Sequence, residues 1–286
     1  MTDTGPQTIA ARAERFRVLH RPGAPFVMPN PWDVGTARIL AGLGFAALAT
    51  TSAGLAFSLG RRDGEGAVGR DEALGHARAI VEATPLPVSA DLENGFGDAP
   101  EAVAQTIALA GAIGLAGASI EDATGDPRRP IYDRGPAIER IAAAAAAARS
   151  LPFAFTLTAR AENYLFGRPD LGDTIGRLQA FAAAGADVVY APGLRDLAEI
   201  RAVCAAVGKP VNVVVGLAGT PLSVAQLAEA GVGRISLGSS LARAALGAFL
   251  RAAREIASEG TFGFAAAAAS FPELQILMAE TGQPRP

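Results

Sequence analysis

The chain of 286 residues repeats one pattern eight times: a short apolar or β-branched run, a turn, and then an amphipathic helical stretch. Glycine often stands between the helical stretch and the next run, as in "AAAGADVV" and "AEAGVGRIS", where it favours the left-handed turn that ends a helix. Alternating strands and helices predict a parallel sheet, and eight such units predict a closed (β/α)8 TIM barrel. The predicted strands are Phe26–Asn30, Phe45–Thr51, Leu86–Asp91, Gly117–Asp122, Phe153–Arg160, Ala186–Pro192, Pro210–Val215 and Gly233–Gly238.

A doubly wound open sheet is the alternative architecture within the α/β class. It is disfavoured because no G-x-G-x-x-G sequence follows the first strand, and because eight units are more than such sheets usually carry. No Pro-, Ser- or Gly-rich linker divides the chain. We therefore predict one barrel domain over residues 1–260, which begins with an amphipathic helix, and a C-terminal helical extension over residues 261–286.

The extension contains an apolar helical stretch, "FGFAAAAASFPELQILMAE", but no ninth strand precedes it for the helix to cover. We expect this helix to pack elsewhere, either within the same domain or, swapped, on another subunit. The alanine runs Ala142–Ala148 and Ala265–Ala269 are too short and too weakly apolar to span a membrane. Because alanine has the highest helix propensity, both runs predict the interiors of closely packed helices.

Charge and cysteine content argue against several classes of function. Lys and Arg number 25 against 28 Asp and Glu, the formal net charge is −3, and no basic run occurs, so neither a nucleic acid nor a membrane is expected as a partner. The N-terminus lacks the pattern of a signal peptide, and no apolar run is long enough for a membrane span. The single cysteine, Cys204, permits no intrachain disulfide, which fits a cytoplasmic location.

Four carboxylates follow neighbouring strands at the carboxyl edge of the predicted barrel, where barrel enzymes place their chemistry. Asp91 and Glu93 follow the third strand in "VSADLENGFGD", Glu121 ends the fourth, and Asp63 lies in the loop after the second. Carboxylates placed so close together repel one another unless they are protonated or bridged by a cation. Because no His or Cys is among them, these oxygens favour Mg²⁺, or Mn²⁺, over Zn²⁺. For Asp63 alone, capping of the next helix is the alternative.

Residues at other strand ends are candidates for binding the substrate. Arg160 ends the fifth strand at the acidic mouth, so we expect it to bind a substrate carboxylate, with an ion pair to Glu162 as the alternative. Asn212 lies on the seventh strand, and Trp32 either walls the pocket or packs under the first helix. Small residues after the second strand offer backbone N–H groups to an anion: Ser52, Ala53, Gly54 and Leu55. Three residues on helical stretches are not expected to be catalytic: His20, His76 and Cys204.

Four ordered motifs at these strand ends resemble the phosphoenolpyruvate mutase/isocitrate lyase superfamily. "NPWDVGTARILAGLGFAALATTSAGLAFSLGRRDGE" is similar to the opening stretch of that family, and "VSADLENGFGD" resembles its D-x-D-x-G-Y/F-G metal motif with Glu93 in place of the second Asp. "GASIED" resembles the strand that follows, and "TARAENYL" resembles the arginine strand. The resemblance extends from about "VMPNPWDVGTARIL" to the C-terminal helix.

The resemblance implies a barrel whose C-terminal helix is swapped between partners, in a homodimer or a homotetramer built of dimers. It also implies a Mg²⁺ site at Asp91, with Asp63, Glu93 and Glu121 contacting metal-bound waters, and a 2-oxo acid that chelates the ion. Backbone N–H groups near Ala53, Gly54 and Leu55, together with the Arg160 side chain, would then hold the substrate.

The sequence departs from the family in its catalytic loops. Lyases of the superfamily that cleave isocitrate or methylisocitrate carry a Lys-Lys/Arg-Cys-Gly-His loop after the fourth strand, whereas this chain has "EDATGDPRRPIYDRG" with neither Cys nor His. The Lys and Asn of the phosphonate enzymes are also missing from this loop, and Pro192 and Gly193 stand where a His or Glu is expected after the sixth strand. These departures argue against isocitrate cleavage and against the mutase reaction.

We therefore predict a Mg²⁺-dependent lyase or decarboxylase that acts on a small 2-oxo dicarboxylate, or its aldol-type adduct, through a metal-stabilised enolate. Arg160, Glu121 and Tyr132 are the predicted catalytic residues. Candidate proton donors are Tyr132, Arg128, Arg129 and a metal-bound water, and "TGDPRRP" is a candidate lid. The alternatives are a hydrolase of a C–P or C–C bond in a related 2-oxo acid, of the phosphonopyruvate or oxaloacetate type, and a 2-oxo acid-binding protein without strong catalysis.

Overall fold

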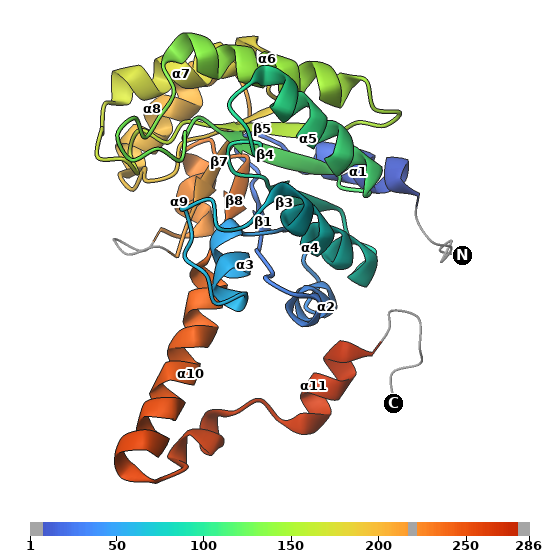
Figure 1. Cartoon of the computed structure of the whole chain (residues 1–286), viewed down its shortest axis with the longest axis vertical. Helices are drawn as coiled ribbons and strands as arrows, with labels where there is room; N and C mark the ends of the chain where they lie inside the picture. The colour runs from blue at the N-terminus through green and yellow to red at the C-terminus, as the bar shows by residue number, and fades with distance from the viewer. Residues whose placement is uncertain (1–7, 217–221, 280–286) are drawn as a thin grey trace.

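The computed structural model describes residues 8–216 and 222–279 and confirms the predicted (β/α)8 barrel (Figure 1). All seven pairings between neighbouring strands are parallel. The strands are β1 (Phe26–Met28), β2 (Leu48–Ala49), β3 (Val88–Asp91), β4 (Gly117–Glu121), β5 (Thr156–Arg160), β6 (Val188–Tyr190), β7 (Val211–Val214) and β8 (Arg234–Ser236). Residues 1–7 of the predicted N-terminal helix and residues 280–286 of the predicted extension lie outside the described residues.

The sheet runs in the order β1-β8-β7-β6-β5-β4-β3-β2, so each strand from β2 to β8 lies beside its sequence neighbour and β8 returns to β1. Between β1 and β2, the described residues form no ladder of paired strands. The seam is closed instead by the backbone N–H of Ala49, which donates to the carbonyl oxygen of Pro29 at 3.1 Å. The barrel is therefore almost, but not completely, continuous in its backbone hydrogen bonding.

The helices that follow the strands form the outer layer (Figure 1). Side-chain caps begin several of them; in α2, for example, Asp33 and Thr36 form a reciprocal capping box. At the end of α8, Gly208 adopts φ 63°, a left-handed conformation that glycine tolerates best. The α-helices are α1 (Ile9–Leu19), α2 (Val34–Gly42), α3 (Ser52–Ser58), α4 (Arg70–Ala83), α5 (Pro100–Ala112), α6 (Arg134–Arg149), α7 (Leu171–Ala183), α8 (Leu197–Val207), α9 (Val224–Glu229), α10 (Ser240–Glu259) and α11 (Phe271–Met278).

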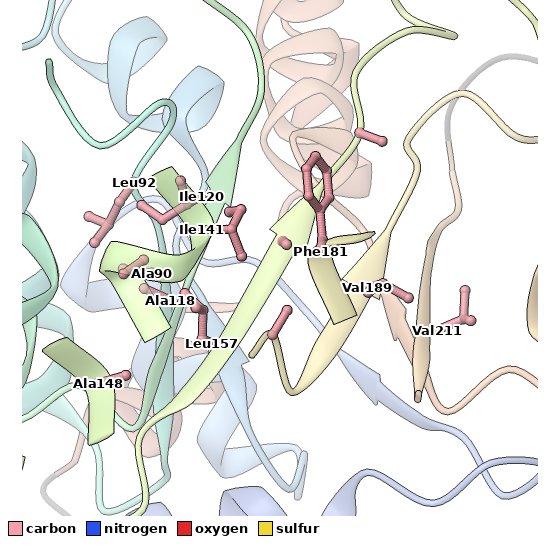
Figure 2. Packing of buried hydrophobic residues seen from close by; sticks show 14 of the residues in the cluster. Ala90, Leu92, Ala118, Ile120, Ile141, Ala148, Leu157, Phe181, Val189 and Val211 are labelled. Carbon is pink, nitrogen blue, oxygen red and sulfur yellow. The ribbon is translucent and has the colours of Figure 1, made fainter. Parts of the chain in front are cut away.

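The core lies between the strands and the outer helices. Strand residues such as Ala118 and Leu157, and the helix residue Phe181, are fully buried in one hydrophobic cluster (Figure 2). The alanine run of α6 contributes Ala144 and Ala148 to this cluster, which confirms the prediction of a closely packed helix interior. Small residues allow the helices to approach closely, since a Cβ atom added to Gly111 of α5 would lie 2.6 Å from the side chain of Leu151.

The strands are shorter than predicted. The apolar run Phe45–Thr51 contains only two residues of strand, Leu48 and Ala49, because only these pair with β3. Flanking apolar residues pack against the core without joining the ladder. The mismatch does not move the strand ends that carry the site.

The prediction of one long helix in the C-terminal extension is wrong. Gly263–Ala267 forms a 3-10 helix, and α11 begins separately at Phe271, with Pro272 in its first turn and Ser270 capping it. The run Ala265–Ala269 is exposed and is not the interior of a packed helix. The break is expected because proline has no N–H to continue a preceding helix and disfavours a helical conformation in the residue before it.

The end of the chain leaves the barrel surface. Helix α10 projects away from the barrel, and α11 returns toward α2 (Figure 1). The Arg38 side chain of α2 donates to the carbonyl oxygen of Met278 at 3.1 Å. Large apolar side chains of α10 remain exposed, among them Phe249 at 67%. In the described part of the chain, none of the helices has the length and apolar character needed to cross a membrane.

Candidate active site

The four predicted carboxylates meet at the carboxyl end of the barrel. Asp91 ends β3 and Glu121 ends β4, and Glu93 lies in the loop after β3. The backbone N–H of Glu121 donates to the carbonyl oxygen of Glu93 at 2.9 Å, which joins the two segments. Asp63 comes from the loop after α3 and interacts with the Ser52 side chain. The structure thus brings together the acids that the sequence placed on separate strands.

Arg160 lies at the centre of these acids. It pairs in register with Glu121 across β4 and β5, and its guanidinium contacts three carboxylates. Nη1 is 2.8 Å from Oδ1 of Asp91, Nη2 is 3.1 Å from Oε2 of Glu121, and Nε is 2.9 Å from Oε1 of Glu162. The Arg160 side chain is only 13% exposed. The ion pair with Glu162, which was the alternative expectation for Arg160, is therefore observed, and binding of a substrate carboxylate by Arg160 stays a prediction.

Three of the acids near Arg160, Asp63, Glu93 and Glu121, have raised pKa values. Burial raises the pKa of Glu93 to about 7, and the charges of Asp91 and Asp63 add to this shift. Burial also raises the pKa of Glu121 well above its ordinary value, against the opposing effect of Arg160. The pKa of Asp63 is raised by partial desolvation and by Asp91. These shifts share burial as their main cause, and the positive charge of Arg160 does not fully offset it.

The oxygen donors of Asp63, Asp91, Glu93 and Glu121 are of the kind that Mg²⁺ prefers. In the part of the chain that the structure describes, no three His, Cys, Asp or Glu side chains are arranged to hold a metal ion directly. Oxygen atoms of Asp91 and Glu121 are instead occupied by Arg160. The arrangement agrees with one direct carboxylate ligand and with other acids acting through water, which is usual for Mg²⁺.

The residues after β2 form a cradle beside Asp91. The backbone N–H of Ser52 donates to Oδ2 of Asp91 at 3.3 Å, and the N–H of Gly54 donates to Oγ1 of Thr51 at 3.3 Å. The N–H of Leu55 donates to the carbonyl oxygen of Thr51 within the first turn of α3. Of the four predicted N–H donors, those of Ser52, Gly54 and Leu55 are therefore already used within the protein. This leaves a substrate fewer free donors than the sequence predicts.

Trp32 packs against this cradle. A Cβ atom added to Gly54 would lie 2.9 Å from the Cβ atom of Trp32, so glycine allows the close approach. The carbonyl oxygen of Trp32 also lies 2.9 Å from Nε2 of His76. Trp32 thus contacts α3 and α4, and whether it walls the pocket or packs under the first helix stays a prediction. His76 has a structural contact.

A small cavity of about 50 Å³ lies inside the barrel beneath the acids, lined by Asp91, Arg160, Tyr190, Asn212 and Arg234 among others. Asn212 is buried here: its Oδ1 accepts from Nε of Arg234 at 2.8 Å, and its Nδ2 donates to Oγ of Ser236 at 2.9 Å. The Tyr190 ring lies 5.2 Å from the Arg160 guanidinium, and burial raises the pKa of the Tyr190 phenol. Asn212 therefore belongs to a polar network in the barrel interior that reaches the site.

His20 closes this network from below. Its Nε2 lies 3.2 Å from Nη1 of Arg234. Burial and the charge of Arg234 lower the pKa of His20 to about 3, so the imidazole is neutral at physiological pH. Burial likewise raises the pKa of the Cys204 thiol on α8 to about 11, which does not suit a nucleophile.

A much larger pocket of about 1310 Å³ opens outward from Glu93 and Glu121. Its walls come mainly from the loop before α4 and the loop after β4, and Val68, Phe96 and Phe166 are among its apolar residues. With Glu93 and Glu121 at its inner end, this pocket has the size and the mixed lining of a binding site for a small molecule.

Comparison with known proteins identifies the family. The family model of phosphoenolpyruvate phosphomutase matches residues 16–257. The chain belongs to the PEP mutase/isocitrate lyase superfamily. The motif resemblance found in the sequence is thereby confirmed.

Individual members of the superfamily differ in what is known of their reactions. The chain is 36% identical over 243 residues to an uncharacterized protein of Mycobacterium tuberculosis, covering 84% of this chain and 88% of that protein. It is 30% identical over 210 residues to the 2-methylisocitrate lyase of Escherichia coli, covering 68% and 69% of the two chains.

Solved structures of the superfamily show the same fold. A Burkholderia cenocepacia protein assigned as a lyase or mutase has a TM-score of 0.90 and 61% identity, with 93% of this chain and 95% of that chain covered. Oxaloacetate acetylhydrolase, solved with its product oxalate, has a TM-score of 0.84 and 27% identity, with 94% of each chain covered. The relatives therefore include both a lyase and a hydrolase.

The loop after β4 is where this superfamily member departs from the lyase motif. Ala123 and Ile131 form an antiparallel bridge that pins the base of the loop. At its tip, Arg128 pairs with Asp126 at 3.2 Å and is strongly exposed. Arg129 is exposed as well. The predicted lid thus stands at the wall of the large pocket, and its closure stays a prediction.

Tyr132 is turned away from the large pocket. It is 4% exposed, its hydroxyl donates to Oδ1 of Asp98, and its ring lies 4.3 Å from the Arg140 guanidinium. It lines neither the large pocket nor the inner cavity. The sequence analysis did not identify Arg140 or Tyr190. Arg140 lies in the middle of α6, away from any strand end, and Tyr190 lies in an apolar run that predicts only a buried strand.

Proposed function

We propose that the protein is a Mg²⁺-dependent lyase that acts on a small 2-oxo acid or its aldol-type adduct and breaks the bond from C3 to the carbon beyond it, decarboxylation included, so that the electron pair stays on the 2-oxo acid as an enolate. The observation that carries this proposal is the excess of carboxylates around one guanidinium at the strand ends. Asp63, Asp91, Glu93 and Glu121 have more negative charge than Arg160 neutralises. The relatives that act on 2-methylisocitrate and oxaloacetate support a substrate of this class.

Asp91 is the residue proposed to bind the ion directly, with Asp63, Glu93 and Glu121 holding its water shell. Bound Mg²⁺ would act as a Lewis acid, which lowers the free energy of negative charge developing on the oxo acid as the bond breaks. The Ser52 N–H and the Arg160 guanidinium both contact Asp91, so they fix the orientation of its carboxylate before any ion arrives. Preorganisation of charged and polar groups is commonly a large catalytic effect.

Arg160 remains cationic throughout. Burial alone would lower its pKa, but Glu162, Glu121 and Asp91 together raise it. Its guanidinium contacts Glu121, which lines the large pocket, and a permanent positive charge there suits recognition of a substrate carboxylate. Glu162 is only 3% exposed and holds Nε, which fixes the plane of the guanidinium.

The second candidate function is hydrolysis of a related 2-oxo acid. It is favoured by one observation: Tyr132 is committed to Asp98 and Arg140, so this predicted proton donor does not face the pocket. Water would then take the place of a side-chain acid or base. A binding protein without turnover is the third candidate.

Product analysis separates these functions. The protein is incubated with Mg²⁺ and, in turn, oxaloacetate, methylisocitrate, isocitrate and phosphonopyruvate, and the products are followed by NMR. A lyase releases pyruvate with CO₂, or a 2-oxo acid with a second acid. A hydrolase releases oxalate with acetate, or pyruvate with phosphate. Turnover that is unchanged in Asp91→Ala would refute the proposed mechanism, and Mg²⁺-dependent binding without turnover would favour the third candidate.

We also propose that the apolar face of α10 is covered by a second copy of this chain, with the C-terminal helix exchanged between partners. The exposure of Phe249, Leu250 and Leu246 supports this assembly, because monomers rarely expose such a contiguous apolar face. Native mass spectrometry should show a homodimer or homotetramer. Phe249→Asp should shift the mass toward the monomer, whereas Arg243→Lys on the same helix should not.

A further inference from the structure

The loop that presents Glu93 has an unusual backbone. The N–H of Gly95 donates to the carbonyl oxygen of Leu92 at 2.8 Å, which closes a tight turn around Glu93 and Asn94. Among the non-glycine residues that the structure describes, only Glu93, with φ 48°, and Phe96, with φ 60°, have positive φ values. Residues other than glycine rarely adopt a positive φ, and this conformation persists only where the surrounding structure enforces it.

One buried side chain binds the backbone of this loop at several points. Arg140 reaches from α6, and its Nη1 donates to the carbonyl oxygens of Gly97 at 2.6 Å and of Asp98 at 2.5 Å. Its Nη2 donates to the carbonyl oxygen of Asn94. The side chain is 2% exposed, so these three bonds replace hydration that the guanidinium has lost.

The Arg140 guanidinium is also held in place from its other side. The Tyr132 ring lies 4.3 Å from it in a cation–π contact, and the Tyr132 hydroxyl donates to Oδ1 of Asp98. The loop is therefore bound through the carbonyl of Asp98 by Arg140 and through the carboxylate of Asp98 by Tyr132. In addition, Oγ1 of Thr106 donates to the carbonyl oxygen of Gly95 at 2.8 Å.

These contacts place the restraint directly after Glu93. Arg140 binds the carbonyl oxygen of Asn94, the residue after Glu93, and those of Gly97 and Asp98 further along the loop. The carbonyl oxygen of Glu93 itself accepts from the N–H of Glu121. A buried carbonyl oxygen is costly to leave without a donor, so the bonds from Arg140 to these carbonyl oxygens favour the backbone shape that presents them. Lysine would keep the charge but lose the planar fork that reaches three acceptors at once.

We propose that Arg140 is a positioning residue: it holds the Glu93–Asp98 turn in its left-handed conformation and so sets the Glu93 carboxylate against Asp91 at the metal site. This inference rests on the proposed function. It assigns Arg140, Tyr132 and Asp98 to one device behind the site, and it gives Tyr132 a structural role in place of proton transfer.

The test measures Mn²⁺ binding by EPR, in the presence of oxalate, for the full chain, Arg140→Lys and Arg140→Met. Hydrogen exchange of the peptide that covers residues 92–98 is measured in the metal-free proteins. The control is Val203→Ala in α8, a fully buried core residue far along the chain, which lowers stability without touching the turn. Thermal unfolding of each variant shows how far stability alone has changed.

We expect the Mn²⁺ dissociation constant to rise at least tenfold in Arg140→Met and nearly as far in Arg140→Lys, with faster exchange in the 92–98 peptide and no such changes in Val203→Ala. Wild-type Mn²⁺ affinity in both Arg140 variants would overturn the inference and leave the proposed function intact. An equal loss of affinity in Val203→Ala would overturn it as well, because the effect would then be general destabilisation. If the wild-type chain itself bound no Mn²⁺, the proposed function would fail and this inference with it.

Discussion

Replacing Glu93 by glutamine should make the metal-free protein more stable at pH 8. The pKa of Glu93 is raised from 4.5 to about 7, chiefly by burial and then by Asp91 and Asp63. Below pH 4.5 the carboxyl is protonated in both the folded and the unfolded chain. As the pH rises, the unfolded chain ionises first, so stability falls until the folded carboxyl also ionises near pH 7, and the loss is constant above that pH.

The size of the effect follows from the shift. A tenfold change in a protonation equilibrium corresponds to about 1.4 kcal/mol, so the raised pKa of Glu93 gives an upper limit of about 3 kcal/mol. Because the side chain is partly exposed, solvent screening reduces this figure to about 1–2 kcal/mol. For a chain of this length, that difference raises the melting temperature by about 2–8 °C.

The assay is thermal unfolding in EDTA from pH 4 to pH 8 for the wild type, Glu93→Gln and the control Glu139→Gln. Glu139 is an exposed carboxylate on α6. The advantage of Glu93→Gln over the wild type should grow between pH 4.5 and pH 7, and Glu139→Gln should follow the wild type. A Glu93→Gln variant that is less stable than the wild type at pH 8, or whose difference does not change with pH, would refute the argument that crowded carboxylates destabilise the empty site.

Two further substitutions test other parts of the structure. Arg160→Met leaves Asp91, Glu121 and Glu162 without their shared cation. Urea unfolding in EDTA at pH 8 should therefore show a free energy of unfolding lower by about 3–5 kcal/mol, and the loss should be smaller at pH 5, where protonation relieves the repulsion. A loss independent of pH would contradict the ion-pair assignment. Gly117→Ala places a Cβ atom 2.5 Å from the carbonyl oxygen of Thr156 between β4 and β5, so circular dichroism should show a melting temperature lower by more than about 4 °C, and an unchanged value would argue against the β4–β5 register.

The fold was predictable because its signals are local and repeated. Each β-α unit carries its own apolar run, turn and amphipathic stretch, so errors in one unit do not affect the others. What the sequence does not show is where hydrogen bonding stops: Phe45–Thr51 is apolar throughout, but only Leu48 and Ala49 pair with β3. In the C-terminal extension, the prediction of a single helix relied on the apolar and alanine-rich composition and gave too little weight to the helix-breaking effect of Pro272, so it was wrong.

The meeting of Asp91, Glu121 and Arg160 was predictable because parallel strands bring their carboxyl ends to one edge. Their individual bonds were not, since the sequence left Arg160 between a substrate and Glu162. Arg140 had no sequence signal, because its partner Gly97 lies 43 residues away and is reached only when α6 packs beside the loop after β3. The direction of the Tyr132 side chain was equally hidden, since it depends on Asp98 and Arg140.

Strands β1 and β2 are joined by fewer hydrogen bonds than the strands that form ladders. Among the described residues, β1 and β2 share a single main-chain hydrogen bond, from Ala49 to Pro29. Separating them breaks fewer hydrogen bonds than separating strands joined by a ladder, so we expect local opening to begin there. Asn30 spans the same gap, its side chain donating to the carbonyl oxygen of Thr50 at 2.8 Å, and Ser52 follows two residues later. Widening of this join would move the Ser52 N–H relative to Asp91, so separation of β1 and β2 would also change the geometry of the candidate site.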